Sequence, residues 1–137
     1  MKQLTRSELR EKIMTILYQI NVYTINKIEY NVDDIIKEVN PIDNEFVKDI
    51  VYGVVTKKEE LDDIANKYLN NWSLDRLGLT DQAIIEIAIY EIKHTETPNL
   101  VCINEAIELS KQYSDEKVSK MINGILDKIY HDYEDNI

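Results

Sequence analysis

The side chains that most often carry catalysis or bind metals are few and scattered in this sequence. The two histidines, His94 and His131, do not have metal-ligand spacing with the single cysteine, Cys102. Glu105 and Glu108 form an i, i+3 carboxylate pair, but on an exposed helix face such a pair is far more often solvated than catalytic. The sequence contains no phosphate-binding glycine loop and no nucleophile elbow. We therefore expect no enzymatic activity, no bound metal and no cofactor.

The remaining candidates favour recognition of single-stranded RNA. Tyr113 ends a predicted helix, and Lys111, Lys117 and Lys120 are near it in the sequence. Unpaired RNA bases commonly stack on aromatic side chains while neighbouring basic side chains hold the phosphates. The alternative is that Tyr113 packs over the junction between two helices, which is the more common outcome for one of nine tyrosines.

The charge distribution limits how nucleic acid could bind. A formal net charge of −10 argues against bulk affinity, because non-specific binding depends on neutralising phosphates with lysine and arginine. Residues 1–20 nevertheless hold four basic side chains against two acidic ones, whereas residues 29–63 hold eleven acids against four lysines. The N-terminus is therefore a mildly basic region on an acidic protein.

Length and composition favour one helical domain. A chain of 137 residues, 44% of them hydrophobic, can bury a substantial core. Only three glycines and two prolines are present, too few for the many turns of an all-β protein. No stretch approaches 18 apolar residues and no signal-peptide core is visible, so we expect a cytoplasmic protein without a membrane span. Cys102 stands between Val101 and Ile103, which predicts a buried, inert thiol.

Hydrophobic residues at helical spacing predict an all-α fold of about seven helices. The helix near residues 80–92 has apolar residues on nearly all sides, as a central helix would. The last two helices form a hairpin, and the loop at 73–79 separates two packed half-bundles, at about 1–72 and 79–130. The predicted helices span approximately residues 5–20, 32–39, 43–55, 57–72, 80–92, 103–113 and 116–129.

Several local features carry expectations that a structure can check. Asp43 and Thr80 are expected to cap the third and fifth helices. A glycine inside a helix costs about 1 kcal/mol relative to alanine, so Gly53 and Gly124 suggest close approach of a neighbouring helix. Trp72 is expected to be an anchor in the core or between the half-bundles.

Two segments resemble a known family. The segment VCINEAIELSK at 101–111 and the segment KMINGILD at 120–127 are similar to the C-terminal signature of the NusB transcription antitermination factors. A weaker resemblance extends over residues 1–20 and 46–92 and is absent over 21–42. The resemblance implies a single NusB-like RNA-binding domain over the whole chain, built from two helical half-bundles.

The resemblance also implies a function. NusB proteins bind the boxA segment of nascent transcripts together with the small-subunit ribosomal protein NusE, and promote read-through by RNA polymerase, notably in ribosomal RNA operons. Ser7 and Glu8 stand where family members often have further arginines. This difference keeps open a non-catalytic protein–protein adaptor with weakened RNA binding. The related RNA-guiding domain of ribosomal-RNA methyltransferases is disfavoured, because 137 residues leave no room for a methyltransferase region.

The family motif can be carried over to individual RNA-binding positions. Tyr113 would stack on a base, and the basic positions would hold phosphates. The full set implied is Lys2, Arg6, Arg10, Arg76, Tyr113, Lys117 and Lys120.

Partner contact is implied for Tyr18, Asp81, Glu86 and Met121. Pairing of an acidic protein with a basic ribosomal protein is electrostatically favourable and gives the net charge of −10 a use. The resemblance leaves open whether the free protein forms a homodimer through the same surface.

Overall fold

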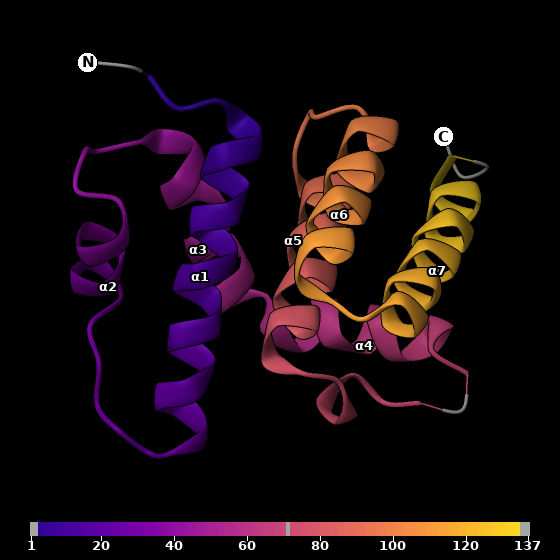
Figure 1. The fold of residues 1–137 in the computed structure, drawn as a ribbon, viewed down its shortest axis with the longest axis horizontal. Coiled ribbons are helices and arrows are strands. Elements are labelled where there is room, and N and C mark those ends of the chain that lie inside the picture. The colour runs from indigo at the N-terminus through magenta and orange to yellow at the C-terminus, as the bar shows by residue number, and fades with distance from the viewer. Residues whose placement is uncertain (1–2, 71, 135–137) are drawn as a thin grey trace.

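Helices alone make up the regular structure of residues 3–70 and 72–134, the part of the chain that the computed structural model describes (Figure 1). The predicted all-α fold with seven α-helices is confirmed, and a short 3-10 helix, η1, is added to it. None of these helices is both long and apolar enough to cross a membrane. The elements are α1 (Arg6–Ile25), α2 (Val32–Val39), α3 (Glu45–Thr56), α4 (Lys58–Tyr68), η1 (Leu74–Arg76), α5 (Leu79–His94), α6 (Asn99–Tyr113) and α7 (Glu116–Glu134).

The central element of the fold is α5. Every residue from 82 to 92 is buried, so this helix contacts neighbours on all sides, as its composition predicts. It packs against α1 and α3 on one side, against α6 and α7 on the other, and against α4, which crosses beneath them (Figure 1). Because α4 packs mainly against α5 and α7, it lies with the C-terminal helices, whereas the sequence division at 73–79 placed it with the N-terminal ones.

The first helix begins with a reciprocal capping pair. The Thr5 hydroxyl accepts a hydrogen bond from the backbone N–H of Glu8 at 3.1 Å, and the Glu8 carboxylate accepts one from the backbone N–H of Thr5 at 3.0 Å. Thr5 therefore caps α1. At the end of α2, the chain leaves the helix at Asn40 before Pro41, so the helix has the predicted range of 32–39.

The caps expected at Asp43 and Thr80 are wrong by one and two residues, respectively. The backbone N–H of Val47 donates to the Asn44 side chain at 3.0 Å, so Asn44 caps α3 instead of Asp43. The fifth helix begins at Leu79 with Gly78 at the cap position, which places Thr80 inside its first turn. Adjacent polar residues compete for one cap site, and helical spacing alone does not choose between them.

The two glycines within helices have different surroundings. A Cβ at Gly53 would lie 2.1 Å from Tyr90 Cζ, so the expected close approach is confirmed. A Cβ at Gly124 would meet nothing within 4 Å, because this residue lies on the exposed face of α7, and the expectation there is wrong. Trp72 is also not an anchor, since 48% of it is exposed, while Leu69 and Leu74 are buried on either side of it in sequence.

Candidate functional site

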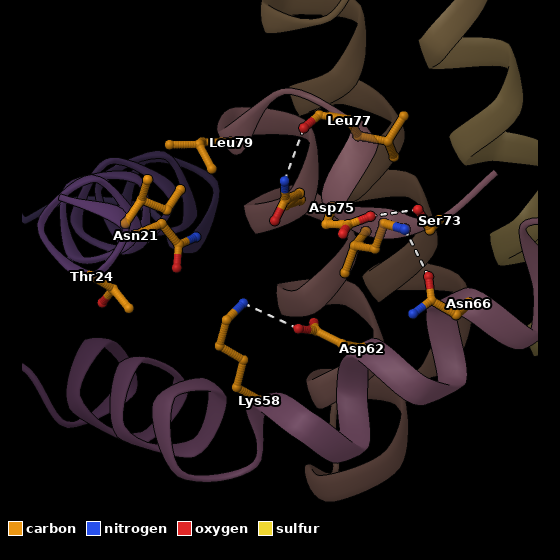
Figure 2. Close-up of a pocket in the computed structure, with 12 residues that line it drawn as sticks. Asn21, Thr24, Lys58, Asp62, Asn66, Ser73, Asp75, Leu77 and Leu79 are labelled. Atoms are coloured by element: carbon orange, nitrogen blue, oxygen red, sulfur yellow. Dashed lines mark hydrogen bonds and ion pairs between the residues drawn. The ribbon is translucent and has the colours of Figure 1, made fainter. Parts of the chain in front are cut away.

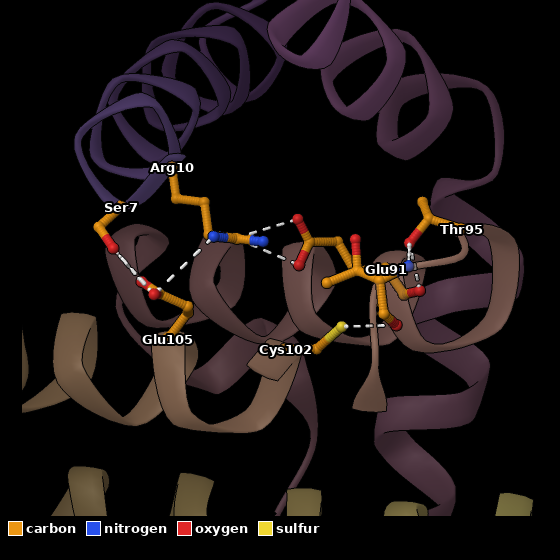
Figure 3. Close-up of polar contacts among 7 residues, drawn as sticks. Ser7, Arg10, Glu91, Thr95, Cys102 and Glu105 are labelled. Atoms are coloured by element: carbon orange, nitrogen blue, oxygen red, sulfur yellow. Dashed lines mark hydrogen bonds and ion pairs between the residues drawn. The ribbon is translucent and has the colours of Figure 1, made fainter. Parts of the chain in front are cut away.

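The N-terminal half of α1 is joined to α5 by a buried ion pair. Arg10 Nε donates to Glu91 at 3.0 Å from Oε1 and 3.2 Å from Oε2, and neither residue is more than 2% exposed (Figure 3). Burial raises the pKa of Glu91, although the guanidinium of Arg10 acts in the opposite direction. The expectation that Arg10 lies on the RNA-facing surface therefore needs correction: in this structure its side chain is enclosed and holds two helices together.

The same region of α1 is tied to α6. The Ser7 hydroxyl lies 2.8 Å from each carboxylate oxygen of Glu105, and Glu105 Oε1 is 4.0 Å from Arg10 Nη1 (Figure 3). Glu105 is thus half-buried and bonded across helices, in contrast to the solvated carboxylate that its spacing to Glu108 suggested. Ser7, which departs from the arginine-rich family pattern, has a structural contact of its own here.

Arg6 and Arg10 flank the same aromatic ring. The guanidinium carbon of Arg6 is 4.5 Å from the centroid of Phe46, and that of Arg10 is 5.1 Å from it. A groove of about 870 Å³ opens beside them, between the start of α1, the start of α3 and the α5–α6 connection. Its lining includes four acidic side chains, those of Glu45, Asp49, Glu96 and Glu105. The exposed Arg6 therefore stands beside an acidic groove, which weakens its attraction for phosphate.

The structure places Tyr113 at the junction between α6 and α7. It ends α6 with 43% of its surface exposed, and its hydroxyl donates to the carboxylate of Glu11 on α1. That hydrogen bond raises the pKa of Tyr113 and orients the ring. Lys117 and Lys120 follow on the exposed first turns of α7, where Lys120 Nζ also pairs with Glu116 at 3.3 Å.

The remaining proposed RNA contacts are dispersed. Arg76 is exposed on η1, which lies at the same lower end of α5 as the α6–α7 connection in Figure 1. Arg6 is exposed on the first turn of α1. Lys2 lies outside the described residues. The structure thus places Tyr113, Lys117 and Lys120 at the α6–α7 junction, whereas Arg6 belongs to the first turn of α1.

The four proposed partner contacts come from three helices, α1, α5 and α7. Tyr18 is 45% exposed on α1, and Asp81 accepts a hydrogen bond from the Ser114 hydroxyl at the start of α5. Met121 is half-buried and lines a hollow between α4 and α7, and Trp72 lines the same hollow. These positions sit on different helices, with α5 between α1 and α7.

Glu86 is not on the surface. It is 1% exposed, and its carboxylate accepts from Lys58 Nζ at 2.7 Å; Lys58 Nζ is also 3.2 Å from Asp62 Oδ2. Burial raises the pKa of Glu86 to about 8, with Asp62 acting in the same direction and Lys58 opposing it. The expected direct contact between Glu86 and a protein partner is therefore corrected to a buried contact with α4.

The pattern of hydrophobic residues did not reveal Glu91 and Phe46 as parts of the site. Glu91 lies in the helix near 80–92 that the sequence predicts to be apolar on nearly all sides, and Phe46 lies in the predicted helix at 43–55. A signal was present, because one acid within a run of buried residues and Arg10 within the apolar stripe of α1 each require a partner. Which acid meets which base could not be read from either helix alone.

Cys102 is buried, as predicted, with its Sγ 3.7 Å from the carbonyl oxygen of Thr97. Burial raises the pKa of its thiol to about 12, which keeps the sulfur protonated and unreactive. Across the described ranges, no group of three or more His, Cys, Asp or Glu side chains is arranged to hold a metal ion.

Comparison with known proteins identifies relatives over nearly the full chain. Residues 7–131 match the NusB family. The transcription antitermination protein NusB of Listeria innocua is 40% identical over 126 residues, which cover 90% of this chain and 94% of that protein. The Bacillus subtilis protein of the same name is 38% identical over 133 residues, 94% and 97% of the two chains. A solved structure of antitermination factors NusB and NusE in complex with double-stranded RNA superposes with a TM-score of 0.79 at 28% identity, covering 93% of this chain and 97% of that chain.

Proposed function

The chain belongs to the NusB family, and we propose that it is a non-catalytic, cytoplasmic transcription antitermination factor. It binds boxA-type single-stranded RNA in nascent transcripts together with the ribosomal protein NusE. The complex assists RNA polymerase in reading through terminators, notably in ribosomal RNA operons. The observation that carries this proposal is the match, over 93% of the chain, to a structure that holds NusB with both NusE and RNA.

The RNA surface we propose is the junction between α6 and α7. The exposed ring of Tyr113 offers a base-stacking face, and Lys117 and Lys120 on the first turns of α7 can contact the adjoining phosphates. Arg76 on η1, just before the start of α5, is a further exposed cation that we assign to phosphate contact. Arg6 contributes less, because the groove beside it is lined by acidic side chains.

The acidic character of the chain makes NusE the source of much of the positive field. With a net charge of −10 and few exposed cations at the RNA surface, this protein alone binds RNA weakly. A basic partner both fits the acidic surface and adds phosphate contacts of its own. RNA affinity is therefore expected to rise when NusE is present.

Fluorescence anisotropy with a labelled boxA-type RNA tests this proposal. We expect weak binding by the protein alone, and tighter binding in the presence of NusE, with a clear preference over a scrambled RNA of equal length. Titrations at two salt concentrations separate phosphate contacts from base stacking, because only the former respond steeply to salt. Equal affinity for both RNAs with and without NusE would contradict the proposal.

A protein–protein adaptor with weakened RNA binding is the second candidate. The structural contact of Ser7 with Glu105 and the acidic groove beside Arg6 favour it, since both reduce the positive surface at the start of α1. In that case the protein would bind NusE normally and show no boxA preference in the same titration.

A further inference from the structure

The groove beside Arg6 takes no part in the RNA surface proposed at the α6–α7 junction. It lies between the start of α1, the start of α3 and the α5–α6 connection, and its volume is about 870 Å³. Sites of about 300–1,000 Å³ typically enclose a small ligand, so the groove can take a few consecutive side chains but no folded domain. Figure 3 shows three of its lining residues, Arg10 on α1, Thr95 in the α5–α6 connection and Glu105 on α6.

The guanidinium of Arg10 at this groove has unused hydrogen-bond donors. Arg10 is 2% exposed, and its Nε–H is the group that bonds to Glu91. Its Nη2 is buried without a hydrogen-bond partner, and its Nη1 lies 4.0 Å from Glu105 Oε1, beyond hydrogen-bond distance. Arginine carries five N–H donors, and buried donors without acceptors destabilise the folded state. An acceptor supplied from the groove would remove part of this cost.

The balance of charge favours a neutral acceptor. Glu91 already compensates the charge of Arg10, and the groove lining holds four further acids against one further base, Arg6. A phosphate or a carboxylate in the groove would be repelled by these acids. A backbone carbonyl oxygen, in contrast, accepts hydrogen bonds and carries no net charge.

The acids along the groove favour a cation beside that acceptor. Glu45, Asp49 and Glu96, here called the rim acids, are exposed and line the groove. Within residues 3–70 and 72–134, none of the rim acids forms an ion pair with a lysine or an arginine. The cleft in Figure 2 differs in this respect, because its Asp62 is paired with Lys58. A basic side chain that enters the groove therefore finds carboxylates without a counter-charge.

Apolar side chains complete the lining. Phe46, Pro98 and Val101 line the groove, and 41% of Val101 is exposed. Such surfaces can cover the aliphatic stem of a lysine or arginine while its charged end stays at the rim.

We propose that this groove binds an extended, basic segment of another protein. A backbone carbonyl oxygen of the segment accepts from the guanidinium of Arg10, and a lysine or arginine of the segment pairs with the rim acids. A second copy of this chain is a poor occupant, because each copy carries a net charge of −10 and the two repel one another.

A library of acetylated and amidated octapeptides, screened against the full-length protein, tests the inference. We expect the retained peptides to share a lysine or arginine at one position. A retained peptide should also shift the side-chain N–H signals of Arg10 in NMR spectra of the protein, since a new acceptor changes their surroundings. A screen that does not enrich basic peptides, or Arg10 signals that stay in place, would overturn the inference.

Charge reversal separates the groove from the general acidity of the protein. Glu45→Lys combined with Glu96→Lys should bind a retained peptide at least about 10-fold more weakly, and a peptide with glutamate in place of its basic residue should recover affinity for this variant. The matched control is Glu59→Lys combined with Glu29→Lys, which changes the net charge by the same amount. Glu59 is exposed in the first turn of a helix, like Glu45, and Glu29 is exposed in a connection, like Glu96. The control should keep the affinity of the unaltered protein, and equal losses in both double variants would contradict the proposal.

Competition with RNA decides between two kinds of occupant. We expect boxA-type RNA to leave the bound peptide in place, because the groove is acidic and the proposed RNA surface lies at another junction. Displacement of the peptide by RNA would assign the groove to RNA binding and overturn the inference. The peptide experiments need neither NusE nor RNA binding, so their outcome is independent of the proposed function.

Discussion

Arg10 Nε lies 3.0 Å from Glu91 Oε1 although the two residues are 81 positions apart in the chain. The pair is enclosed between α1 and α5 and connects the N-terminal helices to the central one (Figure 3). It changes the interpretation of the basic region at the start of α1, because one of its arginines neutralises a buried acid. Phosphate binding must then depend on other cations or on the partner.

Removing Arg10 should cost stability. Arg10→Met leaves the Glu91 carboxylate buried without its counter-charge, and we expect the free energy of unfolding to fall by about 3–5 kcal/mol. Urea denaturation measures this loss in the free energy of unfolding. The double variant Arg10→Met with Glu91→Met should recover most of the loss, since no uncompensated charge remains. Full stability of Arg10→Met together with loss of RNA binding would show instead that Arg10 acts at the RNA surface.

The two helical glycines should respond in opposite ways to alanine. Gly53→Ala places a Cβ against the ring of Tyr90, which is 5% exposed and held by a 3.0 Å hydrogen bond to Asp49. We expect a loss of about 1–3 kcal/mol from overpacking. Gly124→Ala meets open space and should gain about 0.5–1 kcal/mol from helix propensity. Thermal melts of both variants check the contrast, and equal effects would contradict it.

The buried Glu86 should make stability depend on pH. Its pKa is raised from 4.5 to about 8, so between these values the folded state retains a proton that the unfolded state has lost. The contribution of this proton is fully present below pH 4.5 and is lost as the pH rises through about 8, which makes the protein less stable toward higher pH.

Glu86→Gln provides the comparison, because glutamine has a similar shape and cannot ionise. The stability of this variant relative to the unaltered protein should increase between pH 5 and pH 8 by more than about 1 kcal/mol, as measured by urea denaturation. A relative stability that stays constant or decreases would indicate that Lys58 holds Glu86 as a carboxylate throughout.

Stacking on Tyr113 should be separable from its hydrogen bond. Tyr113→Ala removes the exposed ring and should weaken boxA binding about 5- to 100-fold in the presence of NusE. Tyr113→Phe keeps the ring and loses only the bond to Glu11, so its RNA affinity should stay close to that of the unaltered protein. Both variants should bind NusE normally. Equal losses in the two variants would assign the effect to the Glu11 contact rather than to stacking.

The fold was largely predictable from the sequence. The α5 stripe, the end of α2 before Pro41 and the burial of Cys102 depend on periodicity and on local backbone restrictions, which involve neighbouring residues only. The resemblance over residues 101–127 points to the NusB family by itself, and the match over residues 7–131 confirms it. Caps were less certain, because Asp43 and Asn44 compete within one turn.

The surroundings of individual side chains were decided by the tertiary structure. Gly53 and Gly124 each lie within a predicted helix, but Gly53 is packed against Tyr90 and Gly124 faces open space. The spacing of hydrophobic residues does not distinguish these two surroundings. Arg10 and Glu86 are charged residues of the kind usually found at the surface, yet both are buried. Each is paired with an oppositely charged side chain of another helix, Arg10 with Glu91 and Glu86 with Lys58. Burial of a charge requires such a partner, and its identity is set by how the helices pack, which no local stretch of sequence encodes.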